Sequence, residues 1–204
     1  MTDDHPVVEF WYEFASTYSY PAAMRVEARA AARGVTVRWQ PFLLGPIFRA
    51  QGWDSSPFNL QPVKGAYMWR DMARICDAEG LSFVRPDPFP QNGLQAARLA
   101  LALPDDGARA AFSRAVYAAE FGAGMDLTDG SALSALLTEQ GHDPDQIWAA
   151  AQSDAVKSGL RAQTEAAVAH GIFGAPMFRS EDGEIFWGYD RLDQALEWVL
   201  TRNR

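Results

Sequence analysis

The sequence is poor in the residues that most often build metal and redox sites. Its 204 residues include a single cysteine, Cys76, and three histidines, His5, His142 and His170, which share no ligand spacing. One cysteine excludes an intramolecular disulfide and a cysteine metal cluster, so we expect no metal site. Cys76 falls within an apolar helical pattern, where we expect a packed core thiol rather than a reactive one.

Positive charge and long apolar runs are also scarce. The 18 lysines and arginines are outnumbered by 26 acidic residues, which gives a net charge of -8. This balance argues against nucleic acid or an anionic membrane as a partner, because both bind basic patches. No stretch approaches the roughly 20 apolar residues of a membrane span, and residues 1–6 lack the basic and apolar segments of a signal peptide. We therefore expect a cytoplasmic protein, and a small anionic ligand is compatible with it.

What the sequence does hold is enough apolar material for a sizeable core. Hydrophobic residues make up 48% of the chain and charged residues 22%, which excludes a disordered chain. A length of 204 residues fits one large domain or a core domain that carries an insertion.

The first part of the chain has the pattern of a strand, a helix and a second strand. Residues 7–14 are rich in β-branched and aromatic residues, residues 17–33 are rich in alanine and end before Gly34, and residues 35–42 alternate. Two parallel strands joined by a helix form a right-handed βαβ unit. Residues 44–62 follow as a long aromatic loop, and loops of this length often line a site.

A block of helices then separates this unit from a second group of strands. Helices are expected near 63–79, 92–103, 106–122, 129–139, 143–151 and 153–170. Strands return at 177–180 and 184–187, joined by a turn at 181–183, and a final helix opens at 188–190.

This order of elements predicts an α/β fold in which a sheet domain is interrupted by helices. Residues 1–60 and 171–204 form the core in this prediction, with the pattern βαβ … ββα. Residues 61–170 form an all-α helical insertion, because strands occur only before and after them.

Ser16 lies at the turn between the first strand and the first helix. The first backbone N–H groups of a helix have no intrahelical partner, and with the positive end of the helix dipole they stabilise a nearby anion. A phosphate, a carboxylate or a thiolate would each fit. Serine is also a preferred N-cap residue. The two roles are compatible, because a capping hydroxyl can still face a ligand.

The order of elements, with Ser16 in the first turn and Ala175-Pro176 before the hairpin, resembles the thioredoxin superfamily. Proteins of that superfamily carry Cys-x-x-Cys at the start of the first helix and a cis-proline that faces it. Residues 16–19 are Ser-Thr-Tyr-Ser here, so disulfide exchange, which needs two thiols, is excluded. The resemblance implies a thioredoxin-like core and a cis bond before Pro176. A trans proline at the start of an edge strand is the alternative.

Five motifs, spread over nearly the whole chain, resemble the 2-hydroxychromene-2-carboxylate isomerase family, which belongs with DsbA-like proteins and kappa-class glutathione transferases. They are Phe-Ala-Ser-Thr-Tyr-Ser-Tyr at 14–20, Pro-Val-Lys-Gly-Ala-Tyr at 62–67, Phe-Pro-Gln-Asn at 89–92, Phe-Gly-Ala-Pro at 173–176 and Phe-Trp-Gly-Tyr-Asp-Arg-Leu at 186–192. Thr17 replaces the usual proline of the first motif without moving the hydroxyl of Ser16. The family is indicated by the order of the motifs, since any one of them is a weak signal.

The resemblance implies glutathione as the cofactor and a small aromatic carboxylate as the substrate. Ser16 is then catalytic, because its hydroxyl would favour the thiolate of a thiol whose ordinary pKa is about 8.5. The other implied roles are glutathione binding by Ala175, Pro176, Tyr189 and Asp190, and substrate binding by Lys64, Asn92 and Trp187. The thiolate would add reversibly to the substrate and let it rotate about a former double bond. The resemblance also implies a homodimer.

These roles have plainer alternatives. Asp190 is expected at a helix start on dipole grounds alone, and a lysine such as Lys64 is usually exposed. Phe48, Trp53 and Trp69 could wall an aromatic pocket or lie in the core. For the function, the alternatives are a kappa-type glutathione transferase, which consumes glutathione instead of returning it, and a DsbA-like binding protein without redox activity.

Overall fold

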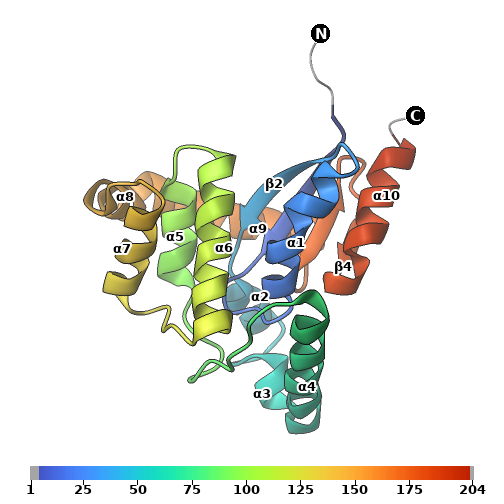
Figure 1. Ribbon diagram of the computed structural model, residues 1–204, viewed down its shortest axis with the longest axis horizontal. Coiled ribbons are helices and arrows are strands. Elements are labelled where there is room, and N and C mark those ends of the chain that lie inside the picture. Colours follow the sequence, from blue (N-terminus) through green and yellow to red (C-terminus); the bar gives the residue numbers. More distant parts are fainter. Residues whose placement is uncertain (1–4, 203–204) are drawn as a thin grey trace.

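The computed structural model describes residues 5–202, which form a sheet with helices packed around it (Figure 1). Among these residues the sheet has four strands in the order β2-β1-β3-β4. Their bounds are β1 (Val7–Tyr12), β2 (Thr36–Pro41), β3 (Met177–Ser180) and β4 (Ile185–Trp187). Residues 1–4 and 203–204, which belong to the predicted core segments, lie outside the described part of the chain.

The first half of the sheet is the predicted βαβ unit. β1 and β2 run parallel, and α1 (Ser19–Ala31) connects them. β3 runs antiparallel to β1 and β4 antiparallel to β3, which is the predicted hairpin. Phe10 of β1 pairs with Trp39 on one side and Phe178 on the other, so aromatic side chains meet across the middle of the sheet. The predicted thioredoxin-like order is confirmed.

The predicted block of helices is also present, with ends that differ from the prediction by at most two residues. Its members are α4 (Pro62–Glu79), α5 (Leu94–Ala102), α6 (Asp106–Ala123), α7 (Gly130–Glu139), α8 (Pro144–Ala151) and α9 (Asp154–Ala169). Asp105, Asp129, Asp143 and Ser153 precede four of these helices, and each side chain accepts a hydrogen bond from a first-turn N–H group. These caps explain why the helices begin where they do.

The expectation of an irregular loop over residues 44–62 is wrong. The segment contains two short helices, α2 (Leu44–Ala50) and α3 (Pro57–Leu60). Leu44 and Ile47, three residues apart, are buried in a cluster beneath the sheet, and this packing supports a helix too short to show a periodic pattern. α3 follows Ser56, whose side chain accepts a hydrogen bond from the N–H of Phe58.

The last helix begins later than predicted. A 3-10 turn, η1 (Tyr189–Arg191), comes first and α10 (Leu192–Arg202) follows. Gly188 precedes the turn with φ at +108°, a conformation that residues with a side chain rarely adopt. Asp190 therefore lies in a turn that leads into the helix and not in its first turn.

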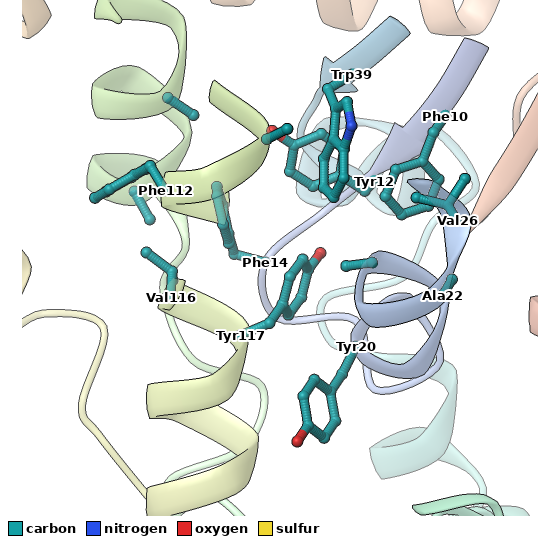
Figure 2. Packing of buried hydrophobic residues seen from close by; sticks show 14 of the residues in the cluster. Phe10, Tyr12, Phe14, Tyr20, Ala22, Val26, Trp39, Phe112, Val116 and Tyr117 are labelled. Carbon is teal, nitrogen blue, oxygen red and sulfur yellow. The ribbon is translucent and has the colours of Figure 1, made fainter. Parts of the chain in front are cut away.

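Alternation along β1 divides its side chains between the two faces of the sheet. Phe10 and Tyr12 belong to the larger buried cluster, whereas Trp11 belongs to a second cluster with residues of α2 and α9. Figure 2 shows the larger cluster, in which α6 packs directly against the sheet and α1: Phe10, Tyr12, Phe14, Tyr20, Ala22, Val26, Trp39, Phe112, Val116 and Tyr117. The division into a core and an insertion at residues 60 and 170 stays a prediction.

Residues 5–202 contain neither a membrane-spanning helix nor an evident metal site. No helix there is both long enough and apolar enough to cross a membrane. No group of three or more His, Cys, Asp or Glu side chains in this range is placed to hold a metal ion. The thiol of Cys76 is buried, and burial raises its pKa to about 11, so Cys76 is the core residue that the sequence predicted.

The core also contains an acidic residue. Glu120 of α6 is fully buried, and neither of its carboxyl oxygens has a hydrogen-bond partner among the described residues. Burial, reinforced by the nearby Glu13, raises the pKa of Glu120 well above its ordinary value of 4.5. Glu120 is therefore neutral in the folded protein near neutral pH.

Replacing Glu120 by glutamine is expected to weaken the pH dependence of stability. The folded state keeps the carboxyl proton and the unfolded chain loses it above pH 4.5, so the wild-type free energy of unfolding falls as pH rises. The difference in melting temperature, Glu120→Gln minus wild type, should be more positive at about pH 8 than at about pH 5. Glu139→Gln, on the exposed side of α7, is the control. Identical pH dependence in wild type and Glu120→Gln would contradict a neutral Glu120.

Candidate active site

A cavity of about 1500 Å³ opens beside the turn that joins β1 to α1. Its walls come from this turn, from α2, α3 and one side of α4, from the segment before α5, and from both sides of the terminal hairpin. Of the eight predicted site residues, those that line it are Ser16, Lys64, Asn92, Ala175, Trp187, Tyr189 and Asp190. Pro176, the eighth, is buried next to Ala175 in the chain. The fold thus gathers residues from both ends and from the middle of the sequence around one cavity.

The turn around Ser16 is fixed by two hydrogen bonds to one carbonyl group. The N–H of Ser16 and the hydroxyl of Tyr117 both donate to the carbonyl oxygen of Glu13, at 3.0 and 2.8 Å. α1 begins at Ser19 without a side-chain N-cap, so the alternative in which Ser16 caps the helix is wrong. The helix starts three residues after Ser16, too far along the chain for the Ser16 hydroxyl to cap its first N–H groups. The hydroxyl instead donates to the carbonyl oxygen of Ala175, at 3.0 Å.

Thr17, the residue after Ser16, connects this turn to α4. Its side chain is buried, and its hydroxyl donates to Sδ of Met68 at 3.1 Å. Among residues 5–202, the backbone N–H groups of Thr17 and Tyr18 have no hydrogen-bond acceptor. They precede the positive end of a 13-residue helix, so the turn favours a negatively charged group.

The peptide bond between Ala175 and Pro176 is cis, in agreement with the resemblance. The backbone of Ala175 lies in the cavity wall and contacts Ser16 there. The carbonyl oxygen of Pro176 accepts a hydrogen bond from the N–H of Gly188 at 3.0 Å. This bond joins the two sides of the hairpin at the cavity.

Trp187 forms an aromatic wall at the mouth of the cavity. Its indole is half exposed and packs edge to face on Phe173, with ring centroids 5.0 Å apart. Gly174 leaves the space for this indole, because a Cβ atom there would lie 2.8 Å from Nε1. The wall therefore depends on the glycine of the cis-proline motif.

A second aromatic wall comes from α2 and the turn after it. Phe48 and Trp53 line the cavity, and their ring centroids are 5.6 Å apart. Trp69, which the sequence also offered as a pocket residue, is not part of the lining. It packs edge to face on Phe89 at 4.7 Å instead.

Lys64 extends from the first turn of α4 and is exposed. Its Nζ lies 5.8 Å from the centroid of the Phe58 ring. Arg49 of α2 lines the same cavity, so two cationic side chains face it although the chain has a net charge of -8. Such a pair favours a carboxylate ligand.

α4 approaches α3 through Gly65, the residue after Lys64. A Cβ atom at Gly65 would overlap with the carbonyl oxygen of Phe58. Gly65→Ala is therefore expected to destabilise the protein by about 1–3 kcal/mol in denaturant unfolding, because the two helices must move apart. Gly159→Ala, in open space on α9, should be neutral or stabilising. An unfolding midpoint unchanged by Gly65→Ala would argue against this close approach.

Asn92 lies just before α5 and is exposed. Its Oδ1 accepts a hydrogen bond from the N–H of Leu94 at 3.1 Å, which orients the side chain. The segment is tied to α3, since Nδ2 of Asn59 donates to the carbonyl oxygen of Phe89 at 2.9 Å. The Nδ2 group of Asn92 is thus the part of the amide available to donate to a ligand.

Tyr189 and Asp190 are neighbours in η1, but their side chains have different surroundings. The hydroxyl of Tyr189 donates to Glu79 and accepts from Arg29 at 3.1 Å. The Tyr189 hydroxyl therefore belongs to a charged cluster with Arg29 of α1 and Glu79 of α4. Tyr189 nonetheless lines the cavity. The carboxylate of Asp190 is 71% exposed and lies 3.6 Å from Arg191. This position at the rim suits the recognition of an ammonium group.

Several lining residues were missed by the sequence analysis. Glu13, Arg49 and the hydrogen-bonded pair of Tyr18 and Asp71 all line the cavity. Glu13 carried a signal, since it is an acidic residue that directly follows an apolar strand and stands three residues before Ser16. Arg49 carried only the general signal of its segment, residues 44–62, which was expected to be a loop that lines a site.

Three features define the class: a thioredoxin-like sheet, a serine before its first helix, and a cis-proline whose preceding residue accepts a hydrogen bond from that serine. The protein is a thioredoxin-superfamily protein without the paired redox cysteines. Comparison with known families gives the narrower assignment. The chain belongs to the DSBA-like thioredoxin domain family, which matches residues 7–199.

Individual relatives cover almost the whole chain. A 2-hydroxychromene-2-carboxylate isomerase from Pseudomonas putida is 31% identical over 191 residues, which are 91% of this chain and 90% of the relative. Glutathione s-transferase kappa 2 from Caenorhabditis elegans is 23% identical over 206 residues, with 95% and 91% covered. A solved structure of 2-hydroxychromene-2-carboxylate isomerase is similar with a TM-score of 0.86 and 26% identity, covering 97% of this chain and 95% of that one. The family resemblance that the five motifs indicated is confirmed.

Proposed function

We propose that this protein is a glutathione-dependent cis/trans isomerase of an aromatic carboxylate such as 2-hydroxychromene-2-carboxylate, with trans-o-hydroxybenzylidenepyruvate as the product. The proposal rests chiefly on the 3.0 Å contact between the Ser16 hydroxyl and the Ala175 carbonyl oxygen inside the large cavity. The names of the isomerase relatives support the same reaction class.

The lining residues fit two parts of glutathione. The carboxylate of Asp190, at the rim of the cavity, suits the ammonium group of the tripeptide. The backbone of Ala175, beside cis-Pro176, suits pairing with a peptide in the manner of an added strand. The ammonium group and the peptide backbone of glutathione therefore each have a counterpart in this cavity.

Ser16 stabilises negative charge and does not act as a base. In the structure its hydroxyl donates to the Ala175 carbonyl, and rotation about one side-chain bond would turn the same O–H toward an anion in the cavity. The N–H groups of Thr17 and Tyr18 provide further donors. Together they favour the ionised form of a thiol with an ordinary pKa of about 8.5. Glutathione, when bound, supplies a thiolate that adds reversibly to the conjugated double bond of the substrate.

The substrate is held by residues that face the thiolate position from α2, α4 and the hairpin. Lys64 and Arg49 bind its carboxylate, and Nδ2 of Asn92 donates to one of its oxygens. The rings of Trp187 and Phe48 pack on its aromatic part. A substrate anchored at both ends can rotate only about the bond between them.

Calorimetric titration with glutathione and with S-methylglutathione tests the glutathione site. Both compounds are expected to bind, because they share the charged ends. Only glutathione should release a proton on binding, and the release is measured as a dependence of the binding enthalpy on the ionisation enthalpy of the buffer. Absence of binding at millimolar glutathione would overturn the site but leave the fold intact.

A kappa-type glutathione transferase is the second candidate, favoured by the likeness to the Caenorhabditis elegans protein. The higher identity to an isomerase, 31% against 23%, supports the first candidate. The proposal also includes the cytoplasmic location expected from the sequence and a homodimer, for which the family resemblance is the support. Sedimentation velocity of the purified chain tests the dimer.

A further inference from the structure

Glu13 is an acidic side chain in the cavity wall to which the proposed function gives no role. It lies three residues before Ser16 and lines the same cavity. Gly93 leaves the space for its carboxyl group, since a Cβ atom there would lie 3.2 Å from Oε1 of Glu13 and 3.0 Å from Cβ of Phe14. Asn92, the adjacent residue, also lines the cavity. The carboxyl group is thus built into the wall where the substrate is proposed to bind.

The surroundings of Glu13 favour the neutral form of its carboxyl group. Burial raises the pKa of Glu13 to about 8, against the opposing effect of a hydrogen bond from the N–H of Ala15. The ionisable groups near it on α6 are Tyr117 and Glu120, and burial raises the pKa values of both. Neither supplies a positive charge near neutral pH.

The cations that face the cavity lie on other walls. Lys64 on α4 and Arg49 on α2 line it, and so do the acidic residues Asp54, Asp71 and Asp190. Desolvation by the surrounding protein is the largest effect on the carboxyl group of Glu13, and none of these five side chains contributes a resolved effect. A neutral carboxyl group in a substrate cavity can donate a proton with one oxygen and accept one with the other.

We propose that Glu13 is a second catalytic residue, which opens the hemiketal ring of the substrate by proton transfer; this inference rests on the proposed function. The bond between the ring oxygen and the hemiketal carbon breaks, and its electron pair goes to the ring oxygen. That oxygen takes the proton of Glu13 and becomes a phenol. The hydroxyl group on the same carbon becomes the ketone, and its proton passes to the Glu13 carboxylate.

The step regenerates Glu13 and needs no other reactant. One proton leaves the carboxyl group and one returns, and the open-chain product has the same atoms as the ring. The open chain carries the conjugated double bond about which the isomerisation takes place. Glu13 therefore acts before the rotation, and Ser16 acts during it.

Glu13→Gln tests the proposal, because glutamine keeps the shape but cannot transfer a proton. Its kcat for isomerisation is expected to fall roughly 100-fold, the lower end of the range for loss of general acid–base catalysis. Its affinity for glutathione should stay within about twofold of the wild-type value, since the binding groups are unchanged. Glu9→Gln, on β1 and outside the cavity, should keep the wild-type kcat.

The pH profile and a spectrum provide readouts that a merely structural role would not change. Wild-type kcat should decline as pH rises through about 8, where Glu13 loses its proton, and Glu13→Gln should lack this decline. With carbon-13-labelled glutamate, one carboxyl resonance of the wild type should titrate near pH 8 and be absent from Glu13→Gln.

The outcomes separate this inference from the proposed function. Wild-type turnover with an unchanged kcat and pH profile in Glu13→Gln overturns the role of Glu13 alone. So does a Glu13 resonance that titrates below about pH 5 in the wild type, even if the variant fails to fold. Absence of wild-type turnover overturns the proposed function and the role of Glu13 with it.

Discussion

Replacing Ser16 by alanine is expected to lower kcat/KM for isomerisation by roughly 100- to 1000-fold, the loss typical of removing one donor to a reacting anion. The Ser16 hydroxyl is the side-chain donor at the turn, next to the N–H groups of Thr17 and Tyr18. Without it, bound glutathione should remain a thiol to a higher pH. Steady-state kinetics measure the first effect, and the ultraviolet absorbance of the thiolate measures the second.

Ser19→Ala is the matched control for this variant. Ser19 stands where thioredoxin-superfamily proteins carry the second cysteine of Cys-x-x-Cys. Its side chain is buried at the start of α1 and does not line the cavity. Its loss should leave kcat/KM within about threefold of the wild-type value. Equal activities of Ser16→Ala and wild type would contradict the role of Ser16.

Replacing Lys64 by methionine is expected to raise KM for the aromatic carboxylate by roughly 10- to 100-fold, which corresponds to the loss of a charge-assisted hydrogen bond. Methionine keeps the length of the side chain and removes its charge. kcat should change much less, because Lys64 binds the carboxylate in the ground state and in the transition state alike. Initial rates over a range of substrate concentrations separate the two constants.

Lys157→Met is the matched control, since Lys157 is the other lysine of the chain and lies on α9 outside the cavity. It should have the wild-type KM. A Lys64→Met variant with the wild-type KM would assign carboxylate binding to Arg49 alone and contradict the role given to Lys64.

The sequence predicted the framework because long, strongly patterned segments carry their own signal. Apolar β-rich residues around Phe10 and Phe178 indicated strands that the structure pairs through β1 and β3. The motifs also pointed to a contact between distant parts of the chain, since Ser16 and Ala175 are 159 positions apart and form a hydrogen bond. Their meeting was implied by resemblance to a family and not by local pattern.

The features that the sequence missed depend on tertiary contacts. α2 is stabilised by burial of Leu44 and Ile47 against the sheet. Its sequence has neither a capping residue nor a helical pattern long enough to predict it. The position of Arg49 in the cavity follows from that helix. Ser16 was a reasonable N-cap by residue type, but α1 starts at Ser19, and where a helix starts is the least predictable part of it. The place of the Glu13 carboxyl group in the cavity wall could not be predicted from the local sequence, because it depends on Gly93, which lies 80 residues away.

Isomerase and transferase share the thiolate site and differ in the fate of glutathione. Isomerisation returns glutathione unchanged, whereas transfer leaves it attached to the product. In the proposed function Lys64 and Arg49, which both line the cavity, anchor a carboxylate that holds the substrate while one bond rotates.

The most direct test is turnover of 2-hydroxychromene-2-carboxylate by the purified wild-type protein, with and without glutathione and with glutathione quantified before and after. The proposed function predicts formation of trans-o-hydroxybenzylidenepyruvate only when glutathione is present, and full recovery of glutathione after many turnovers. Turnover without glutathione, or loss of one glutathione for each product formed, would contradict it.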